Sequence, residues 1–400
     1  MKPPWKRLTF GTLGRVFNGN SISASEKKAH FAGVRDGVPY IGTKDVGFDH
    51  EIEYDSGVQI PSGKQAGFKL ALPDTVLVCA EGGSAGRKIA HVDRPVYFGN
   101  KLFAICPTQI TSSRFVFYYC LSDAFKSDFK DSLAGLIGGV SLNKFKEIGI
   151  GLPPLPEQRR IVAILDEAFA GIATAKANAE RNVRNARAVF ESQLHATFAS
   201  GHPGWVSRLL KEVCERITDG THQTPTYFDD GFVFLSSRNV TSGKIDWDRI
   251  KYIDAKQHAE MHKRVAPRRG DILLAKNGTT GVAAMVDRDT IFDIYVSLAH
   301  LRPLPGIRPE FLLHFLNSPA AKYQFNKRLK GVGVPNLHLE EIREVSIPIP
   351  NGILEQDRII AALNRLRDEV ERLEASYDKK LTALDNLKKS LLHQAFTGNL

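Results

Sequence analysis

The chain has 400 residues, of which 42% are hydrophobic and 24% charged, and its formal net charge is +10. This length suits two or three globular domains, and no stretch approaches the roughly 18 apolar residues that a membrane span requires. The first residues lack the apolar run of a secretory signal, so we expect a cytoplasmic protein. The four cysteines show no metal-ligand spacing, which argues against disulfides and zinc, and we predict neither a metal nor a cofactor.

An internal repeat with a period of about 195 to 200 residues organises the sequence. A period of this length is too long for a solenoid and indicates a duplicated domain. The matching segments are VPYIGTKDV from Val38 and FVFLSSRNV from Phe232, TVLVCAEGGS from Thr75 and DILLAKNGTT from Asp271, FVFYYCLS from Phe115 and FLLHFLNS from Phe311, and LPPLPEQRRIVAIL from Leu152 and IPIPNGILEQDRIIAAL from Ile347.

The repeat divides the chain into residues 1–152, 153–200, 201–347 and 348–400. In the first and third segments, short β-branched and aromatic runs bounded by Gly, Pro, Asn or Asp predict strands. Phe115–Lys130 and Phe311–Lys330 have the pattern of helices. We therefore predict an α+β protein with two similar mixed α/β modules, in which the order of the strands stays open.

The second and fourth segments are predicted to be long helices. Prolines end the preceding strands, and helix starts are expected near Glu157 and Glu355, with no proline in the following forty residues. Apolar residues then recur at spacings of three and four, as in a coiled coil. The positions expected to pair the two helices are Leu165, Ile172, Ala179 and Asn182 in one and Leu366, Leu373, Tyr377, Lys380 and Leu384 in the other.

The small residues of the first helix stand where the second has large ones, which favours close antiparallel packing, and the polar positions Asn182 and Lys380 are suited to fix the register. The alternative is that each helix packs only on its own module. Because Trp205 follows the first helix almost directly, an antiparallel return of the second helix would place Leu400 near Met1. A rod of about 42 residues would be roughly 60 Å long, or fewer than about 18 base pairs of DNA.

Basic residues are concentrated in the modules. Lys and Arg outnumber Asp and Glu by 19 to 14 in residues 1–152 and by 21 to 17 in residues 201–347, but the counts are 6 to 5 and 8 to 8 in the helical segments. We therefore expect the modules, and not the helices, to bind a polyanion such as double-stranded DNA.

Matched loops of the two modules carry different side chains, as two readers of different DNA sequences require. Lys44 corresponds to Arg238, Glu81 to Asn277 and Ser84 to Thr280. Lysine and arginine contact guanine in the major groove, and asparagine pairs with adenine. The alternative for each is a solvated surface side chain. The DNA-binding candidates are Lys44, Arg238, Asn239, Asn277 and Thr280, with Arg87, Lys88, Lys101 and Lys276 as expected phosphate contacts and Lys144 and His338 on the loops leading toward the helices.

None of the motifs that suggest catalysis is supported by the residues around it. Gly82 to Gly86 match the GxSxG pattern of hydrolases, but Thr280 replaces Ser84 in the matched loop and no His and Asp follow in a suitable order. The sequence has no phosphate-binding loop, and it lacks the methyltransferase motif of Asn or Asp before Pro-Pro-aromatic, since Pro3-Pro4-Trp5 follows Lys2. We therefore predict a chain that is not an enzyme.

The sequence resembles the specificity subunit of type I restriction-modification systems. The resemblance rests on the two PLPEQxxIVxxL-like segments, the DGTHQTPTYFDDG run from Asp219, the GDILLAKNGTTG run from Gly270 and the GVGVPNL run from Gly331. It implies two target recognition domains, each reading half of a bipartite asymmetric site, and two conserved helices that dock two methyltransferase subunits. It also implies that methylation and cleavage reside on the methyltransferase and motor-nuclease partners. The competing hypothesis is a coiled-coil scaffold whose modules bind other ligands.

Overall fold

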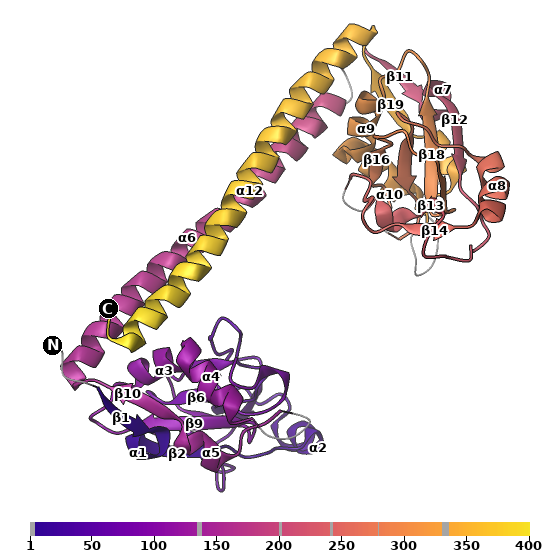
Figure 1. Ribbon diagram of the computed structural model, residues 1–400. Helices are drawn as coiled ribbons and strands as arrows, with labels where there is room; N and C mark the ends of the chain where they lie inside the picture. The colour runs from indigo at the N-terminus through magenta and orange to yellow at the C-terminus, as the bar shows by residue number, and fades with distance from the viewer. Residues whose placement is uncertain (1–4, 134–137, 200–201, 241–242, 279, 330–335) are drawn as a thin grey trace. The chain divides into compact units, whose positions relative to one another are not determined.

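The computed structural model describes residues 5–133, 138–199, 202–240, 243–278, 280–329 and 336–400. The chain forms two compact units, of which unit 1 comprises Met1–Ala179 and Lys379–Leu400 and unit 2 comprises Glu180–Asp378. Each unit contains one globular module and a part of each of two long helices (Figure 1). Among the described residues, no helix is both long and apolar enough to cross a membrane.

The module of unit 1 is built on two four-stranded sheets and a two-stranded ribbon. The first sheet is antiparallel with the order β2-β9-β6-β7; the second has the order β4-β3-β8-β5, with β3 and β8 parallel; and β1 pairs with β10. The strands are β1 Lys6–Thr9, β2 Gly14–Asn18, β3 Val38–Ile41, β4 Val58–Ile60, β5 Leu70–Ala71, β6 Val76–Cys79, β7 Ile89–His91, β8 Val96–Phe98, β9 Leu102–Pro107 and β10 Gly149–Leu152.

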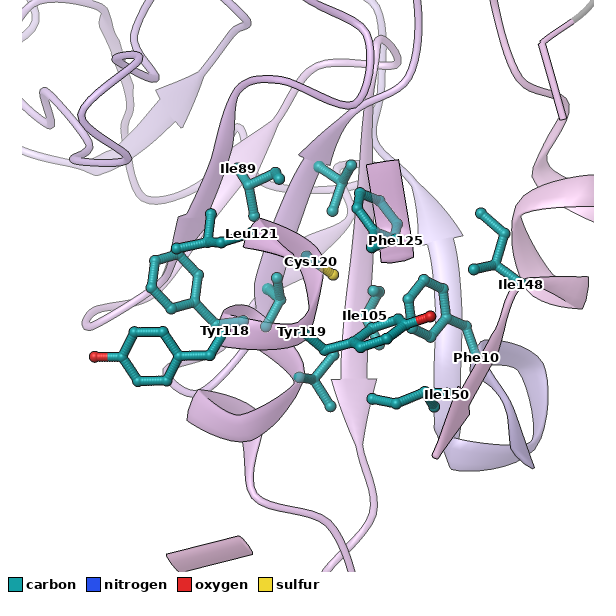
Figure 2. Close-up of a cluster of buried hydrophobic side chains, with 14 of the residues drawn as sticks. Phe10, Ile89, Ile105, Tyr118, Tyr119, Cys120, Leu121, Phe125, Ile148 and Ile150 are labelled. Carbon is teal, nitrogen blue, oxygen red and sulfur yellow. The ribbon is translucent and has the colours of Figure 1, made fainter. Parts of the chain in front are cut away.

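Every residue of β6 is buried because both faces of its sheet are covered. Val76 and Val78 face a cluster that includes the helices, while Leu77 and Cys79 face the second sheet. Figure 2 shows the first of these clusters, in which aromatic and aliphatic side chains converge from helices and strands. The short helices of the module are α1 Phe10–Leu13, α2 Ala24–Glu26, the π-helical turn η1 Lys27–Phe31, the 3₁₀ turn η2 Gly82–Ser84, α3 Ser113–Leu121, α4 Asp123–Asp131 and α5 Leu142–Glu147.

The module of unit 2 repeats this plan. Its main sheet has the order β12-β18-β15-β16, a smaller sheet has the order β14-β13-β17 with β13 and β17 parallel, and β11 pairs with β19. The strands are β11 Val206–Leu209, β12 Cys214–Asp219, β13 Phe232–Leu235, β14 Lys251–Ile253, β15 Ile272–Ala275, β16 Ala283–Met285, β17 Phe292–Ile294, β18 Leu298–Pro303 and β19 Ser346–Ile349. Its helices are α7 Leu210–Val213, the 3₁₀ turn η3 Ser237–Asn239, α8 Ala255–Arg264, α9 Pro309–Asn317, α10 Pro319–Arg328 and α11 Leu339–Arg343.

Each of the two predicted module helices is in fact a pair. Ser122 separates α3 from α4, and Ser318 separates α9 from α10. Both serines have extended backbone, and their side chains accept a hydrogen bond from the first turn of the following helix. The prediction of one helix was wrong because an N-cap inside an apolar run is hidden by the surrounding periodicity. Lys330, the predicted end of the second helix, lies outside the described residues.

The long helices are α6 Leu155–Phe198 and α12 Ile353–Thr397, and both begin two residues before the predicted start. A buried glutamine in the first turn of each attaches the helix to its module. The Gln158 side chain accepts from Ser112 N at 2.8 Å and donates to Pro153 O at 2.9 Å. The Gln356 side chain accepts from Arg308 N at 2.9 Å and donates to Gly306 O at 3.1 Å. In the Glu-Gln pair that recurs at residues 157–158 and 355–356, the glutamine therefore has the structural role of holding each long helix to its module.

The two helices pair antiparallel within each unit. In unit 1, Lys176 donates to Asp385 at 2.5 Å. In unit 2, the Asn182 amide donates to the Tyr377 hydroxyl at 3.0 Å and Arg187 donates to Glu374 at 2.5 Å. As the residue number increases along α6, the number of its contact partner on α12 decreases, which shows that the two helices are antiparallel. The predicted α+β architecture with two related modules and two long helices is confirmed.

Three of the nine predicted pairing positions lie off the contact face. Leu165, Ile172 and Ala179 of α6 are buried, as is Val370 of α12, and Leu366, Tyr377 and Leu384 are half-buried. Asn182 of α6 and Leu373 and Lys380 of α12 are exposed. Val189 of α6 and Leu387 of α12, which continue the same spacing, are exposed as well.

The residue after each of these exposed α12 positions is half-buried instead, namely Glu374, Leu381 and Lys388. The predicted strict seven-residue repeat assumed 3.5 residues per turn, and a straight helix of 3.6 drifts away from that pattern by about 20° per heptad. Lys380 is therefore not an inward-facing partner of Asn182, and the observed polar contact of Asn182 is with Tyr377.

The C-terminal end of each long helix packs into a module core. In unit 1, Leu392 and Ala395 of α12 are buried in the cluster of Figure 2, and Leu400 packs against that cluster. In unit 2, Leu194 and Phe198 of α6 have the same role. The expected proximity of Leu400 to Met1 concerns a residue outside the described ones, but the main-chain oxygen of Leu400 accepts from Arg160 at 2.6 Å in the same unit.

Candidate nucleic-acid interface

A cavity of about 340 Å³ in unit 2 opens where β13 ends and the turn η3 begins. Its lining combines three aromatic rings, three cationic side chains and several hydroxyl groups, which are the side chains that bind phosphates and stack on bases. The Lys251 ammonium lies 3.8 Å from the centre of the Tyr227 ring. The lining residues are Tyr227, Phe234, Ser236, Ser237, Arg238, Asn239, Arg249, Lys251, Tyr295 and Ser297.

Arg238 lines this cavity, and the residue is exposed. Burial raises the pKa of Tyr227, and the positive charge of Arg238 opposes that rise. Both side chains line the same cavity and can act on the same ligand. The sequence identified Arg238 but missed Tyr227, Arg249 and Lys251, because they come from a loop and a strand that only the fold brings together.

Asn239 holds the turn that presents Arg238. Its side chain accepts from Ser236 N at 2.9 Å and donates to the main-chain oxygens of Asp246 at 3.3 Å and Arg249 at 3.1 Å. The buried amide is thus occupied by the protein itself. We correct the expected DNA contact of Asn239 to a positioning role, because both polar atoms of its amide already have protein partners.

Asp45 of unit 1 takes the place of Asn239 in the matched turn. Its carboxylate accepts from Gly42 N at 2.8 Å and from Ser56 Oγ at 2.9 Å. The turn therefore presents Lys44, whose side chain is 72% exposed, with its ammonium 3.9 Å from Asp45. Both modules hold the same turn with a buried polar side chain, while the exposed cation differs.

An exposed aromatic ring gathers the other predicted cations of unit 1. Phe48 is 57% exposed, and the charged groups of Arg87 and Lys88 lie 5.0 and 5.1 Å from its ring centre. Lys88 also donates to Thr43 O at 3.0 Å, which ties it to the turn of Lys44. Phe48 was missed because a single aromatic residue in a loop carries no periodic signal.

Lys101 is exposed in the turn between β8 and β9. Burial raises the pKa of the Cys79 thiol, and the charges of Lys88 and Lys101 both oppose this rise. The Lys101 main-chain oxygen also accepts from Ala80 N at 2.9 Å. Lys44, Phe48, Arg87 and Lys88 form one basic and aromatic surface, which we call the Phe48 surface.

Lys276 was predicted to contact phosphate, but it is a buried ion-pair partner. Its ammonium lies 3.1 Å from Asp219, which also accepts from Arg264 at 2.6 Å. Burial raises the pKa of Asp219, but the hydrogen bonds from Arg264 and Lys276 outweigh it and lower the pKa below its ordinary value. Lys276 is only 5% exposed, so we correct its expected role to holding the loop that begins at Asp219.

The loops of Glu81 and Asn277 occupy equivalent positions in the two modules. Glu81 forms an isolated bridge with Gly139, and Asn277 forms one with Asn336. The hairpins around them differ in length, since Val78 pairs with Ile89 but Leu274 pairs with Ala283, two residues sooner. The matched loops are thus built to different lengths as well as with different side chains.

This length difference corrects the match of Ser84 with Thr280. Gly86 and Gly281 both have positive φ and both pack against a phenylalanine of the second module helix, so they are the equivalent positions. Thr280 directly precedes Gly281, whereas Ser84 lies two residues before Gly86. The GxSxG segment contains the 3₁₀ turn η2 between β6 and β7.

The remaining two candidates lie in depressions that also hold carboxylates. His338 is exposed and lines a cavity of about 480 Å³ with Asp219, His222, Glu340 and Arg343 among its neighbours. Lys144 lines a shallow cavity with two aspartates of α4 and the following turn. A phosphate would meet negative charge at both places, so the structure favours the Phe48 surface and the Arg238 cavity over them. Part of the GVGVPNL run, residues 331–335, lies outside the described residues.

Comparison with known proteins assigns the family. The profile of the type I restriction modification DNA specificity domain matches twice, over residues 4–181 and 203–382. The EcoBI specificity subunit of Escherichia coli is 23% identical, with 99% of this chain and 86% of that protein covered. The MjaVIII specificity subunit of Methanocaldococcus jannaschii is 25% identical, with 64% of this chain and 63% of that protein covered.

Solved structures have the same fold. A chain from a study of complex assembly and conformational transition of the type I R-M system covers all of this chain and 99% of its own length, with a TM-score of 0.80 and 21% identity. The HsdS subunit of Thermoanaerobacter tengcongensis covers all of this chain and 98% of its own length, with a TM-score of 0.60 and 20% identity. On the two profile matches, which together span most of its length, the chain belongs to the type I restriction-modification DNA specificity family.

Proposed function

We propose that this chain reads a bipartite, asymmetric DNA site, one half with each module. The target recognition domains are residues 1–152 and 201–347, and the conserved helices are residues 153–200 and 348–400. DNA sequence recognition follows from membership of the specificity family. The assignment of one half-site to each module rests on the surfaces described above.

The proposal rests on one observation: the two modules contain the same turn, but the turn presents a different cationic side chain in each. Asp45 and Asn239 fix the same turn with the same hydrogen bond to the main chain three residues earlier. The turn then presents Lys44 in one module and Arg238 in the other. A bidentate arginine and a single ammonium recognise base edges differently, so a conserved frame with different side chains suits two different half-sites.

The residues around the two turn cations also differ between the modules. Arg238 lies with Tyr227, Lys251 and Tyr295 at a cavity, whereas the turn of Lys44 is bonded to Lys88, whose ammonium lies over the exposed ring of Phe48. Cationic groups beside aromatic rings bind the phosphate backbone and stack on sugars or unpaired bases. The excess positive charge of both modules supports the same conclusion.

The long helices are proposed to set the half-site spacing and to dock partner subunits. A helix of 44 residues is about 66 Å long, and its near-neutral charge gives it no attraction for DNA. Exposed apolar side chains on both helices, including Val189, Leu354, Leu373 and Leu387, supply surface for protein contacts. We propose two methyltransferase subunits and the motor-nuclease subunits as partners in the cytoplasm, with all catalysis on those chains.

Binding of the reconstituted complex with its methyltransferase partner to a random duplex library tests this function. We expect selection of one bipartite sequence, and affinity that falls steeply as the salt concentration rises because phosphate contacts release counterions. Salt-sensitive binding without sequence selection would contradict recognition. Absence of DNA binding would favour a scaffold whose modules bind another ligand.

A further inference from the structure

Three potential metal ligands meet between α8 and β17 in unit 2. His258 and His262 are one turn apart on the same face of α8, and Asp293 is the central residue of β17. Their potential ligand atoms all lie within 4.8 Å of one another. The sequence expectation of no metal relied on cysteine spacing and overlooked this His-x3-His pair, whose third member is far along the chain.

The geometry of the trio is close to that of a coordination sphere. Nδ1 of His258 lies 2.6 Å from Oδ2 of Asp293, and Nδ1 of His262 lies 3.1 Å from Oδ1. Two ligand atoms that each lie ~2.1 Å from a tetrahedral ion are ~3.4 Å apart. The His258 contact would therefore lengthen by about 0.8 Å and the His262 contact by about 0.3 Å, through rotation of the two imidazoles.

The charge of Asp293 also calls for a cation. Its side chain is only 2% exposed, and the ion-pair partners found for it among the described residues are the two imidazoles. A buried carboxylate without a compensating positive charge is strongly unfavourable. A divalent ion bound by all three groups would supply that positive charge.

The fold does not require a carboxylate at this place. In unit 1, Tyr97 of β8 pairs with Tyr40 as Asp293 of β17 pairs with Phe234, so a tyrosine stands where unit 2 has Asp293. The aspartate is therefore particular to the second module, and so is the helix that carries its histidine partners.

The ligands are also held in place by their neighbours. The His258 ring stacks on Phe232, with centroids 3.8 Å apart and the planes 8° from parallel. His262 is 31% exposed, which leaves one side of the trio open to solvent. Rigid orientation of a ligating imidazole and an open position are features of protein metal sites.

We propose that His258, His262 and Asp293 bind one divalent transition-metal ion, best matched by zinc, with the remaining position open to water. Two imidazoles and one carboxylate suit zinc, whereas magnesium and calcium prefer oxygen ligands alone. The ion clamps α8 to the smaller sheet. Asp293 lies two residues before Tyr295, and Phe232 begins the strand that leads to Arg238, so the clamp supports the cavity at which we place DNA recognition.

The test uses the full chain without an affinity tag, stripped of metal with a chelator. Titration with Zn²⁺ followed by calorimetry and native mass spectrometry should show one ion per chain, and excess Zn²⁺ should raise the melting temperature. Co²⁺ should give the visible absorption of a low-coordinate site. His262→Gln and Asp293→Asn should lose all three responses, while His195→Gln, which removes an exposed helical histidine in the same unit, should keep them.

Three results would overturn the proposal. One is wild-type protein that takes up no stoichiometric zinc, and another is His262→Gln protein that binds zinc as the wild type does. The third is an equal rise in melting temperature with Mg²⁺ and Zn²⁺. Because Asp293→Asn changes a buried group and could unfold the module, the half-exposed His262 variant decides the matter by itself.

Discussion

The aromatic ring of Phe396 packs edge-on against that of Phe115, with centroids 5.1 Å apart and planes at 61°. In unit 2, the rings of Phe198 and Phe311 meet in the same way at 5.3 Å and 63°. Each module core is thus completed by the last turn of a long helix. The helix ends are parts of the modules, and the two helices are not appendages to independently finished domains.

Phe396→Ala should therefore destabilise unit 1. Removing a half-buried aromatic ring from this cluster is expected to cost roughly 2–4 kcal/mol of unfolding free energy, through lost burial and the cavity left behind. Calorimetric melting of the purified chain measures the effect. Leu387→Ala on the exposed side of the same helix is the control and should change the melting temperature little; equal effects of the two changes would contradict this packing.

The corrected contact face of α12 makes a second prediction. Val370 is 8% exposed and Leu373 is 39% exposed, although a strict heptad would place both between the helices. Val370→Lys should lower the melting temperature clearly, because it buries an unpaired charge, whereas Leu373→Lys should be tolerated. A lower melting temperature for Leu373→Lys than for Val370→Lys would contradict this contact face and support the strict heptad pattern.

Tyr377 connects this contact face to DNA spacing. Tyr377→Lys removes the hydroxyl that accepts from Asn182 and should weaken helix pairing. We expect the modification complex to accept sites with altered spacer length while the bases of both half-sites stay the same. Methylation of duplexes with spacers lengthened and shortened one base pair at a time measures this, and a change in the recognised bases would refute the proposed role of the helices.

Asp271 makes unit 2 sensitive to acid. Burial raises the pKa of Asp271, but hydrogen bonds from Arg302 and His300 outweigh it and hold the pKa well below its ordinary value of 3.8. A carboxyl with a depressed folded-state pKa stabilises the fold fully above its unfolded-state pKa, and this stabilisation is lost as the pH falls through the folded-state pKa.

Asp271→Asn should therefore lower stability at pH 7, and its deficit relative to the wild type should shrink as the pH falls below about 4. Denaturant unfolding from pH 7 to pH 3 provides the measurement. Asp289→Asn, which changes an exposed carboxyl, is the matched control and should show little deficit at any pH. A deficit of Asp271→Asn that stays constant across this range would rule out the charge as its cause.

The sequence was most informative where chemistry is local. The duplication and the two long helices were predicted from short matching segments and spacings. Lys44 and Arg238, chosen from one such segment, are exposed on matched turns. The break at Ser122 was missed because a cap looks like one more polar residue in an amphipathic run. The contact face of the helices was misplaced because a straight helix has 3.6 residues per turn and not 3.5. The difference is small in one turn but shifts the contact face after several turns.

The parts of the candidate site that were not predicted depend on contacts distant in sequence. Lys276 is basic and adjacent to a glycine-rich loop, and its burial became apparent only from Asp219, which lies 57 residues earlier in the chain. Phe48 and Tyr227 acquire their importance from cations that the fold places beside them. Composition indicates that a surface binds anions, but the tertiary structure decides which cations remain available.

The central claim is that Lys44 and Arg238 serve different half-sites, and mapping methylated adenines in a host genome tests it most directly. The wild-type complex should modify one bipartite motif. Arg238→Ala should relax about one base pair in one half, at a cost of roughly 1–3 kcal/mol, and Lys44→Ala should alter only the other half. Arg372→Ala, the same change on an exposed position of α12, should leave the motif intact. An unchanged motif in both module variants, or changes confined to the same half, would contradict the assignment of one reader to each half-site.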